Sequence, residues 1–226
     1  TNNERGSFEL DSSTLVKQSR EVEAKKAAQV LGKKEIFFLE YPDGFLADYP
    51  INELREKFIK FIRKIRPKVV LTFDPWAKNE PHPDHRMVSV AAMEAVSFAN
   101  MPLFHPEHAK EGLKPHLVVE TYYFAKDSSN ANKVIDITKF VDKKVEALCA
   151  HDSQMKLFID DIRLTLEATG ENPEMLAVLD RDNYRPLLEL AIRAWAQRVG
   201  QKAGYEYGEE FRYEKAGELI KKITQG

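Results

Sequence analysis

The sequence predicts an α/β protein with a mostly parallel sheet and a helical C-terminal third. Two segments with helical periodicity lie in the first 65 residues, and each is followed by a short apolar run that is typical of a buried strand. A third helical segment follows the second run, and helical periodicity dominates after residue 138. Helices that alternate with buried strands favour a parallel sheet covered by crossover helices.

The first helix is predicted over residues 14–31, with Gly32 at the C-cap position. Its apolar face consists of residues at helical spacing: Ala24, Ala27, Ala28 and Leu31. Residues 35–39 follow as a predicted strand buried on both faces. A second helix is predicted from Asn52 to Ile65, where Pro67 prevents its continuation.

Residues 68–73 form the next predicted strand, and a third helix follows with its apolar face between Val88 and Ala99. Residues 99–115 contain three prolines and indicate an irregular insertion. Further strands are predicted over residues 117–124 and 134–137. Helices are expected from Thr138, from Pro173 and over residues 186–202, the last of them burying Leu190 and Trp195. We expect a single domain over residues 1–226.

The composition restricts the class of protein. The 226 residues carry a net charge of −2, which gives no general attraction to nucleic acid or to an anionic membrane. The one cysteine, Cys149, cannot form an internal disulfide, and no apolar run approaches the roughly 20 residues of a membrane span. We therefore expect a cytoplasmic protein without a nucleic-acid or membrane partner.

The densest group of functional side chains follows the strand at residues 68–73. In the run Pro81-His82-Pro83-Asp84-His85 the two histidines are three residues apart at the start of a helix, so both rings can approach one point. Imidazole is a common zinc ligand and a general acid or base near neutral pH. A bare His-x-x-His pair is more often a surface feature, and this motif offers at most two or three of the ligands that a catalytic zinc requires.

For the other polar residues a structural role is at least as well supported as a functional one. Arg20 lies among charged residues on the first helix and is expected on a solvated face, while Asp43 fits an ordinary Pro-Asp-Gly turn as well as a substrate contact. Surface positions are expected for the remaining histidines of the insertion region: His105, His108 and His116. His151 is expected near a helix end and Cys149 in the core.

These motifs resemble the LmbE-like, or PIG-L type, zinc-dependent N-acetylglucosamine deacetylases. The resemblance rests on motifs in the family's order: Arg20-Glu-Val-Glu23, Tyr41-Pro-Asp43-Gly44, Pro81-His82-Pro83-Asp84-His85, His151-Asp-Ser153-Gln154 and Tyr207-Gly-Glu-Glu-Phe211-Arg. The run Asp74-Pro-Trp76 is most similar to the diacetylchitobiose deacetylase branch. The resemblance implies a Rossmann-like three-layer fold, a zinc cofactor, an N-acetylated amino-sugar substrate and a homo-oligomer.

The resemblance also implies roles for single residues. His85 would bind zinc, His82 would stabilise the oxyanion of the tetrahedral intermediate, and Asp84 would orient His82. Arg20 and Asp43 would hold sugar hydroxyl groups. Zinc lowers the pKa of its bound water toward about 7 and polarises the acetamide carbonyl, which makes an amide hydrolase intelligible.

One departure from the family pattern is large. The family's first strand ends in a His-Pro-Asp-Asp motif that supplies two more zinc ligands and the general base, and this sequence contains no such motif. We expect that an N-terminal strand-helix-strand unit is absent from the sequence. Two alternatives stay open: a non-catalytic carbohydrate-binding protein that has lost the metal, and a metal hydrolase of another substrate.

Overall fold

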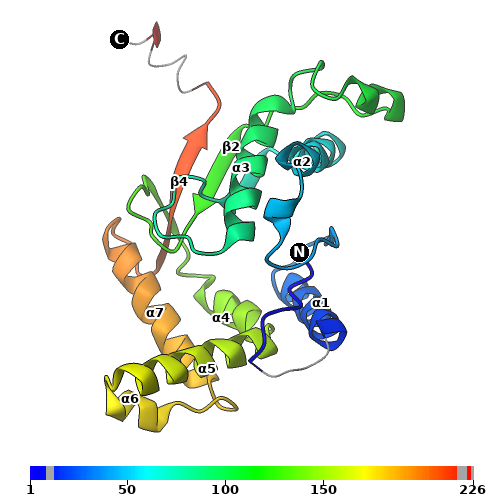
Figure 1. Cartoon of the computed structure of the whole chain (residues 1–226). Helices are drawn as coiled ribbons and strands as arrows, with labels where there is room; N and C mark the ends of the chain where they lie inside the picture. The colour runs from blue at the N-terminus through cyan, green and yellow to red at the C-terminus, as the bar shows by residue number, and fades with distance from the viewer. Residues whose placement is uncertain (9–12, 218–222, 225–226) are drawn as a thin grey trace. The chain divides into compact units, whose positions relative to one another are not determined.

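The computed structural model describes residues 1–8, 13–217 and 223–224 (Figure 1). It is a mixed α/β protein, which confirms the predicted fold class. The chain divides into two compact units. Unit 1 contains residues 1–43 and 135–209, and unit 2 contains residues 44–134 and 210–226. That the chain forms one domain stays a prediction.

Unit 2 carries the sheet and two long helices. Its helical elements and first two strands are η1 (Leu46–Asp48), α2 (Ile51–Ile65), β1 (Val69–Phe73), α3 (Pro83–Phe98), η2 (Pro106–Glu111) and β2 (Glu120–Phe124). Two more strands, β3 (Lys133–Asp136) and β4 (Gly208–Lys215), complete the order β1-β2-β4-β3. Strand β1 pairs in parallel with β2 from Val69↔Glu120 to Phe73↔Phe124, whereas β2 pairs antiparallel with β4.

Helices α2 and α3 pack side by side in unit 2 (Figure 1). The helical spacing of their apolar residues places one face of each helix in a common core. Its buried members come from both helices and from the segment before β2: Ile59, Ile62, Ala95, Ala99 and Val118. This core holds the C-terminal end of α3 against α2, and the predicted histidine pair lies at the opposite end of α3.

A single arginine holds the insertion after α3. Arg63 on α2 is 3% exposed and donates hydrogen bonds to four backbone oxygens, those of Ala99, Met101, Phe104 and His105, at 2.7–3.1 Å. It also contacts His108 Nδ1 at 3.0 Å. The expected surface position of His108 is therefore wrong: its side chain is 1% exposed.

Unit 1 is helical in the part that the structure describes. Its helices are α1 (Ser13–Val30), α4 (Val141–Cys149), α5 (Asp152–Thr169), α6 (Pro173–Val178) and α7 (Arg185–Gln201). Helix α4 contacts α1, α5 and α7, and a second core forms around Ile159, Leu179 and Tyr184. The expected helical C-terminal third is confirmed, although Leu190 and Trp195, which were expected in the core, are 67% and 48% exposed.

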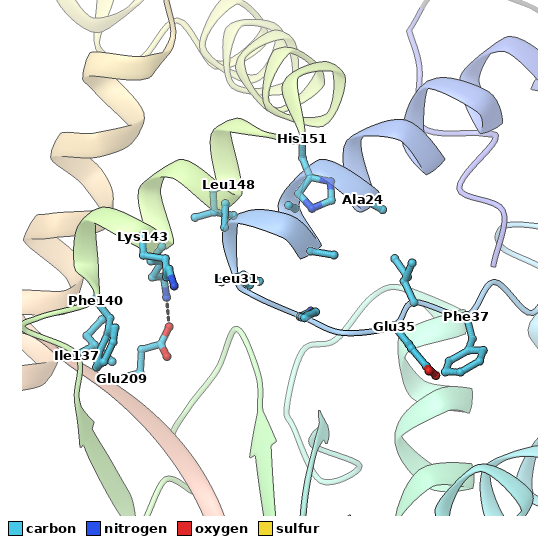
Figure 2. Close-up of a pocket in the computed structure, with 16 residues that line it drawn as sticks. Ala24, Leu31, Glu35, Phe37, Ile137, Phe140, Lys143, Leu148, His151 and Glu209 are labelled. Atoms are coloured by element: carbon cyan, nitrogen blue, oxygen red, sulfur yellow. Dashed lines mark hydrogen bonds and ion pairs between the residues drawn. The ribbon is translucent and has the colours of Figure 1, made fainter. Parts of the chain in front are cut away.

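The predicted strand at residues 35–39 is wrong in this structure. The segment has no strand assignment, and Ile36 and Phe37 are 38% and 44% exposed. It borders an apolar cavity of about 770 Å³ within unit 1, together with α1 and α4 (Figure 2). A strand needs a hydrogen-bonding partner as well as apolar side chains, and none of the described strands pairs with this segment.

Among the helices that the structure describes, none combines the length and apolar character that crossing a bilayer requires.

Candidate functional site

The predicted histidine motif lies where β1 gives way to α3. Strand β1 ends at Phe73, and the chain passes through residues 74–82 before α3 begins at Pro83, the first helical residue. His82 is the N-cap, and its Nδ1 accepts a hydrogen bond from the backbone N–H of Asp84 at 3.2 Å. Proline at the first helical position and a side-chain acceptor at the N-cap are favourable for starting a helix, so this sequence fixes the histidine that precedes it.

His85 lies between two other rings. Its imidazole stacks on Phe73 at a centroid distance of 4.1 Å and on His82 at 4.4 Å. Because Phe73 is the last residue of β1, this contact places His85 at the carboxyl end of the strand, as predicted. Burial, with a further contribution from His82, lowers the pKa of His85, so the imidazole is neutral at pH 7. Neutral imidazole is the form that binds metal ions.

Glu80 is a site residue for which the sequence suggested no role. Its side chain is 9% exposed, and its Oε1 lies 3.2 Å from His85 Nδ1, which meets the distance of an ion pair but not the angle of a hydrogen bond. The same oxygen accepts the N–H of His82 at 3.0 Å. Burial acts to raise the pKa of Glu80, but the hydrogen bond from His82 and the nearby His85 ring hold it below its ordinary value.

The contacts of the two rings distinguish the roles of their nitrogens. Because His82 Nδ1 accepts a hydrogen bond, the neutral ring carries its proton on Nε2 and presents a donor. In His85 the Glu80 carboxylate faces Nδ1, which favours the proton on that atom and leaves Nε2 as an electron-pair donor. The residues thus fit a metal ligand at His85, supported by a carboxylate, and a hydrogen-bond donor at His82.

Asp84 joins the start of α3 to the turn after Asp43. It is 3% exposed, and its two carboxylate oxygens accept the N–H groups of Gly44 at 2.7 Å and Leu46 at 3.0 Å. One of these oxygens lies within 4.8 Å of a ring nitrogen of His82. Its role as the group that orients His82 stays a prediction.

The two predicted sugar-binding residues belong to unit 1, and both are buried. The expectation of a solvated face for Arg20 is wrong, because the residue is 5% exposed and Nη2 donates to Gly6 O at 2.8 Å. Among the described residues, its Nε and Nη1 have no hydrogen-bond partner. Asp43 is 7% exposed and accepts from Thr1 Oγ1 at 3.3 Å and from Arg5 N at 3.4 Å.

The motif that contains Arg20 has a second buried member. Glu23 is 9% exposed, and its carboxylate accepts both the N–H and the hydroxyl of Ser153 at 2.8 Å. The helical spacing places Arg20 and Glu23 on one face of α1, and Glu23 acts to raise the pKa of Arg20 while burial, the larger effect, lowers it. The contact between Glu23 and Ser153 therefore joins the motif that begins at Arg20 to the motif that begins at His151.

Three side chains of the insertion lie close enough together to be possible metal ligands: His105, Glu107 and His108. The nitrogens of His108 are both engaged, Nδ1 by Arg63 and Nε2 by Glu56 Oε1 at 2.7 Å. Arginine can only donate, so Nδ1 is the acceptor and Nε2–H is the donor to Glu56. We interpret His108 as a structural residue that helps to hold the insertion.

Comparison with known proteins relates part of this chain to a family of deacetylases. The family model for PIG-L, described as GlcNAc-PI de-N-acetylase, matches residues 1–96. The diacetylchitobiose deacetylase of Thermococcus kodakarensis is 33% identical over 193 residues, which are 84% of this chain and 61% of that protein. A probable N-acetyl-α-D-glucosaminyl L-malate deacetylase 2 of Bacillus anthracis is 29% identical over 66% of this chain and 61% of its own length.

A solved structure shares the fold. The N,N'-diacetylchitobiose deacetylase from Pyrococcus horikoshii, complexed with its inhibitor MPG, matches 95% of this chain and 70% of that chain with a TM-score of 0.73 and 28% identity. The chain spans about 61% of the length of the curated relatives that it matches. Residues 1–96 thus match the PIG-L family model, and the chain shares the fold of this deacetylase.

Proposed function

We propose that this chain is part of a zinc-dependent deacetylase that removes the acetyl group from an N-acetylglucosamine-containing substrate. The observation that carries the proposal is the pair of stacked imidazoles at the end of β1, of which His85 presents an electron pair and His82 a proton. The activities named for the relatives support the same reaction class.

In this proposal His85 holds the metal through Nε2, and Glu80 orients its ring from the Nδ1 side. Zinc, when bound, supplies a water of lowered pKa and polarises the acetamide carbonyl. His82 directs its Nε2–H toward the carbonyl oxygen of the substrate, where negative charge develops as the amide is attacked. The bond from Asp84 N keeps the His82 ring in the required orientation.

Arg20 and Asp43 are proposed to hold sugar hydroxyls. The Nε and Nη1 donors of Arg20, which lack partners among the described residues, match hydroxyl oxygens, and a buried unpaired donor costs free energy until a partner arrives. Asp43 accepts two long hydrogen bonds, and a sugar hydroxyl at a shorter distance can replace either of them.

The ligand set that this sequence offers is incomplete. A catalytic zinc has three protein ligands as a rule, and we propose that the remaining ligands and the general base belong to a His-Pro-Asp-Asp motif that the sequence does not contain. We further propose, from the resemblance, that the protein is a cytoplasmic homo-oligomer.

The test measures zinc stoichiometry and acetate release from N,N'-diacetylchitobiose, with the 226-residue chain and with a longer chain that carries a strand ending in His-Pro-Asp-Asp. We expect strong zinc binding and acetate release from the longer chain only. Sugar binding without zinc or acetate release in both chains would support the non-catalytic carbohydrate-binding alternative. Full activity of the 226-residue chain would show that its ligands include residues that we interpret as structural.

A further inference from the structure

Trp76 presents its indole ring to solvent from a backbone that is held on both sides. The residue is 60% exposed. Its N–H donates to Asp74 Oδ1 at 3.0 Å, and its carbonyl oxygen accepts from Asn130 Nδ2 at 3.4 Å. A hydrogen bond of 3.2 Å from Ala77 N to Asp74 O closes the turn. Burying part of a tryptophan is normally favourable, so an exposed indole on a fixed turn is available to a ligand.

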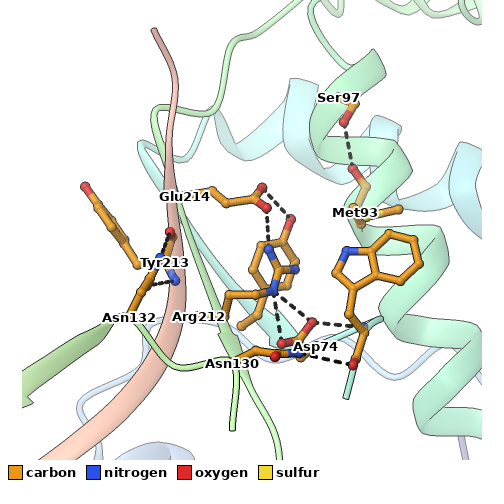
Figure 3. A network of polar contacts seen from close by, with 10 residues as sticks. Asp74, Met93, Ser97, Asn130, Asn132, Arg212, Tyr213 and Glu214 are labelled. Carbon is orange, nitrogen blue, oxygen red and sulfur yellow. Dashed lines mark hydrogen bonds and ion pairs between the residues drawn. The ribbon is translucent and has the colours of Figure 1, made fainter. Parts of the chain in front are cut away.

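The turn is anchored by a buried ion pair (Figure 3). Arg212 Nε lies 3.0 Å from each carboxylate oxygen of Asp74, and the two side chains are 13% and 5% exposed. The guanidinium of Arg212 also lies over the Tyr123 ring at 4.0 Å and donates to Glu214. Such a contact, shielded from water on several sides, fixes Asp74 and with it the position of Trp76. We call the Trp76 indole on this anchored turn the platform. Because it is ordered before a ligand arrives, it loses little conformational entropy when the ligand binds.

The platform lies close to the histidine pair along the chain. Trp76 is three residues after Phe73, whose ring stacks on His85. Three Cα–Cα steps span at most about 11 Å, and the turn between Asp74 and Ala77 shortens this distance to less than that. This upper limit on the Cα separation of Phe73 and Trp76 is on the order of the length of a disaccharide.

We propose that the Trp76 indole stacks against the second sugar ring of a disaccharide substrate, and that this contact gives preference for a disaccharide over N-acetylglucosamine. The proposal rests on the function proposed above. The C–H groups on one face of a pyranose pack against an aromatic ring as an apolar surface, while its hydroxyls stay in water. A contact of this kind supports a preference of about tenfold, or about 1.4 kcal/mol.

The chain contains two tryptophans, which makes the test direct. In a Trp195→Phe variant all tryptophan emission comes from Trp76, and in a Trp76→Phe variant it comes from Trp195. Each variant is titrated with N,N'-diacetylchitobiose and with N-acetylglucosamine. We expect the Trp76 emission to change and to saturate at about tenfold lower concentration with the disaccharide, and the Trp195 emission to stay constant.

Anchoring of the turn is tested in the same background with Arg212→Lys, which keeps the charge but loses the paired contact with both Asp74 oxygens. We expect this variant to weaken disaccharide binding and to reduce the preference. Equal affinity for the two sugars, a response from Trp195 alone, or no response of Trp76 would each overturn the proposal. Acetate release by the longer chain that carries the His-Pro-Asp-Asp strand separates the two proposals. Turnover by that chain without a Trp76 response refutes the sugar contact of Trp76 only. A disaccharide-selective Trp76 response in that chain without turnover refutes the deacetylase only.

Discussion

Replacing Asp84 by Asn tests the link between the turn at Gly44 and the start of α3. The two carboxylate oxygens of Asp84 accept the amides of Gly44 and Leu46 in a site that is 3% exposed. Hydrogen bonds to a charged group contribute about 1.5–3 kcal/mol each. Asparagine keeps one acceptor oxygen and turns an NH₂ group toward the other amide, so one bond is lost, one becomes neutral and two donors face each other.

These changes add up to an expected loss of about 2–4 kcal/mol in the free energy of unfolding. The measurement is urea denaturation in a Trp195→Phe background, where the emission of Trp76 reports on unit 2. Amide hydrogen exchange at Gly44 and Leu46 should accelerate in parallel, because both N–H groups lose the carboxylate.

Asp127→Asn is the matched control, because Asp127 accepts an exposed, local hydrogen bond from Ser129 N at 2.9 Å. The denaturation midpoint of this variant should stay nearly unchanged. A similar, small effect of both substitutions, with unchanged exchange at Gly44 and Leu46, would refute the view that Asp84 holds the turn.

Three further outcomes are expected. In a complete protein, His85→Ala should remove bound zinc, whereas His82→Ala should retain zinc and lose turnover; metal analysis decides, and equal zinc loss would contradict the division of roles. Burial lowers the pKa of His151 in the folded chain, so the unfolded chain binds a proton first as pH falls below about 6.5, and stability decreases by at most about 1.4 kcal/mol per pH unit. In a His151→Gln variant the melting temperature should therefore change less between pH 7 and pH 5 than in the wild type. The same pH dependence in both proteins would contradict a contribution of His151. Arg63→Met should lower the free energy of unfolding by about 3–5 kcal/mol and make the insertion susceptible to proteases, because the backbone oxygens that Arg63 binds lose their donors. Arg66→Lys, at an exposed position, is the control. If the Arg63→Met variant resists proteolysis as well as the wild type, the insertion does not depend on the guanidinium.

The local periodicity of the sequence predicts most of unit 2. Helices α2 and α3 and strand β1 lie where it places them, because each depends on the spacing of its own apolar residues. Strand β4 could not be predicted in this way. Five of the eight residues in its sequence Gly-Glu-Glu-Phe-Arg-Tyr-Glu-Lys are charged, and its pairing with β2 joins residues about 90 positions apart. His151 lies near a helix end, as expected, because α4 ends at Cys149; it is also the N-cap of α5, a separate helix that the periodicity does not predict.

In the candidate site, too, local sequence patterns predict some residues and not others. The spacing of His82 and His85 and their place after a strand predict a paired site at the end of β1. The contribution of Glu80 could not be predicted, since it requires the left-handed backbone of Asn79, at φ 59°, in the turn just before it. The burial of His108 depends on Glu56, 52 residues away, and on Arg63, so no local pattern indicates it.

Strand β1 has a consequence for handling the protein. It forms one edge of the four-stranded sheet in the described part of the chain, and Val69 and Leu71 on it are 47% and 58% exposed. A strand edge with free backbone groups and apolar side chains can recruit the same edge of another molecule. Concentrated solutions of this chain should therefore become turbid on warming, and a lysine at position 71 should act as a gatekeeper that keeps them clear.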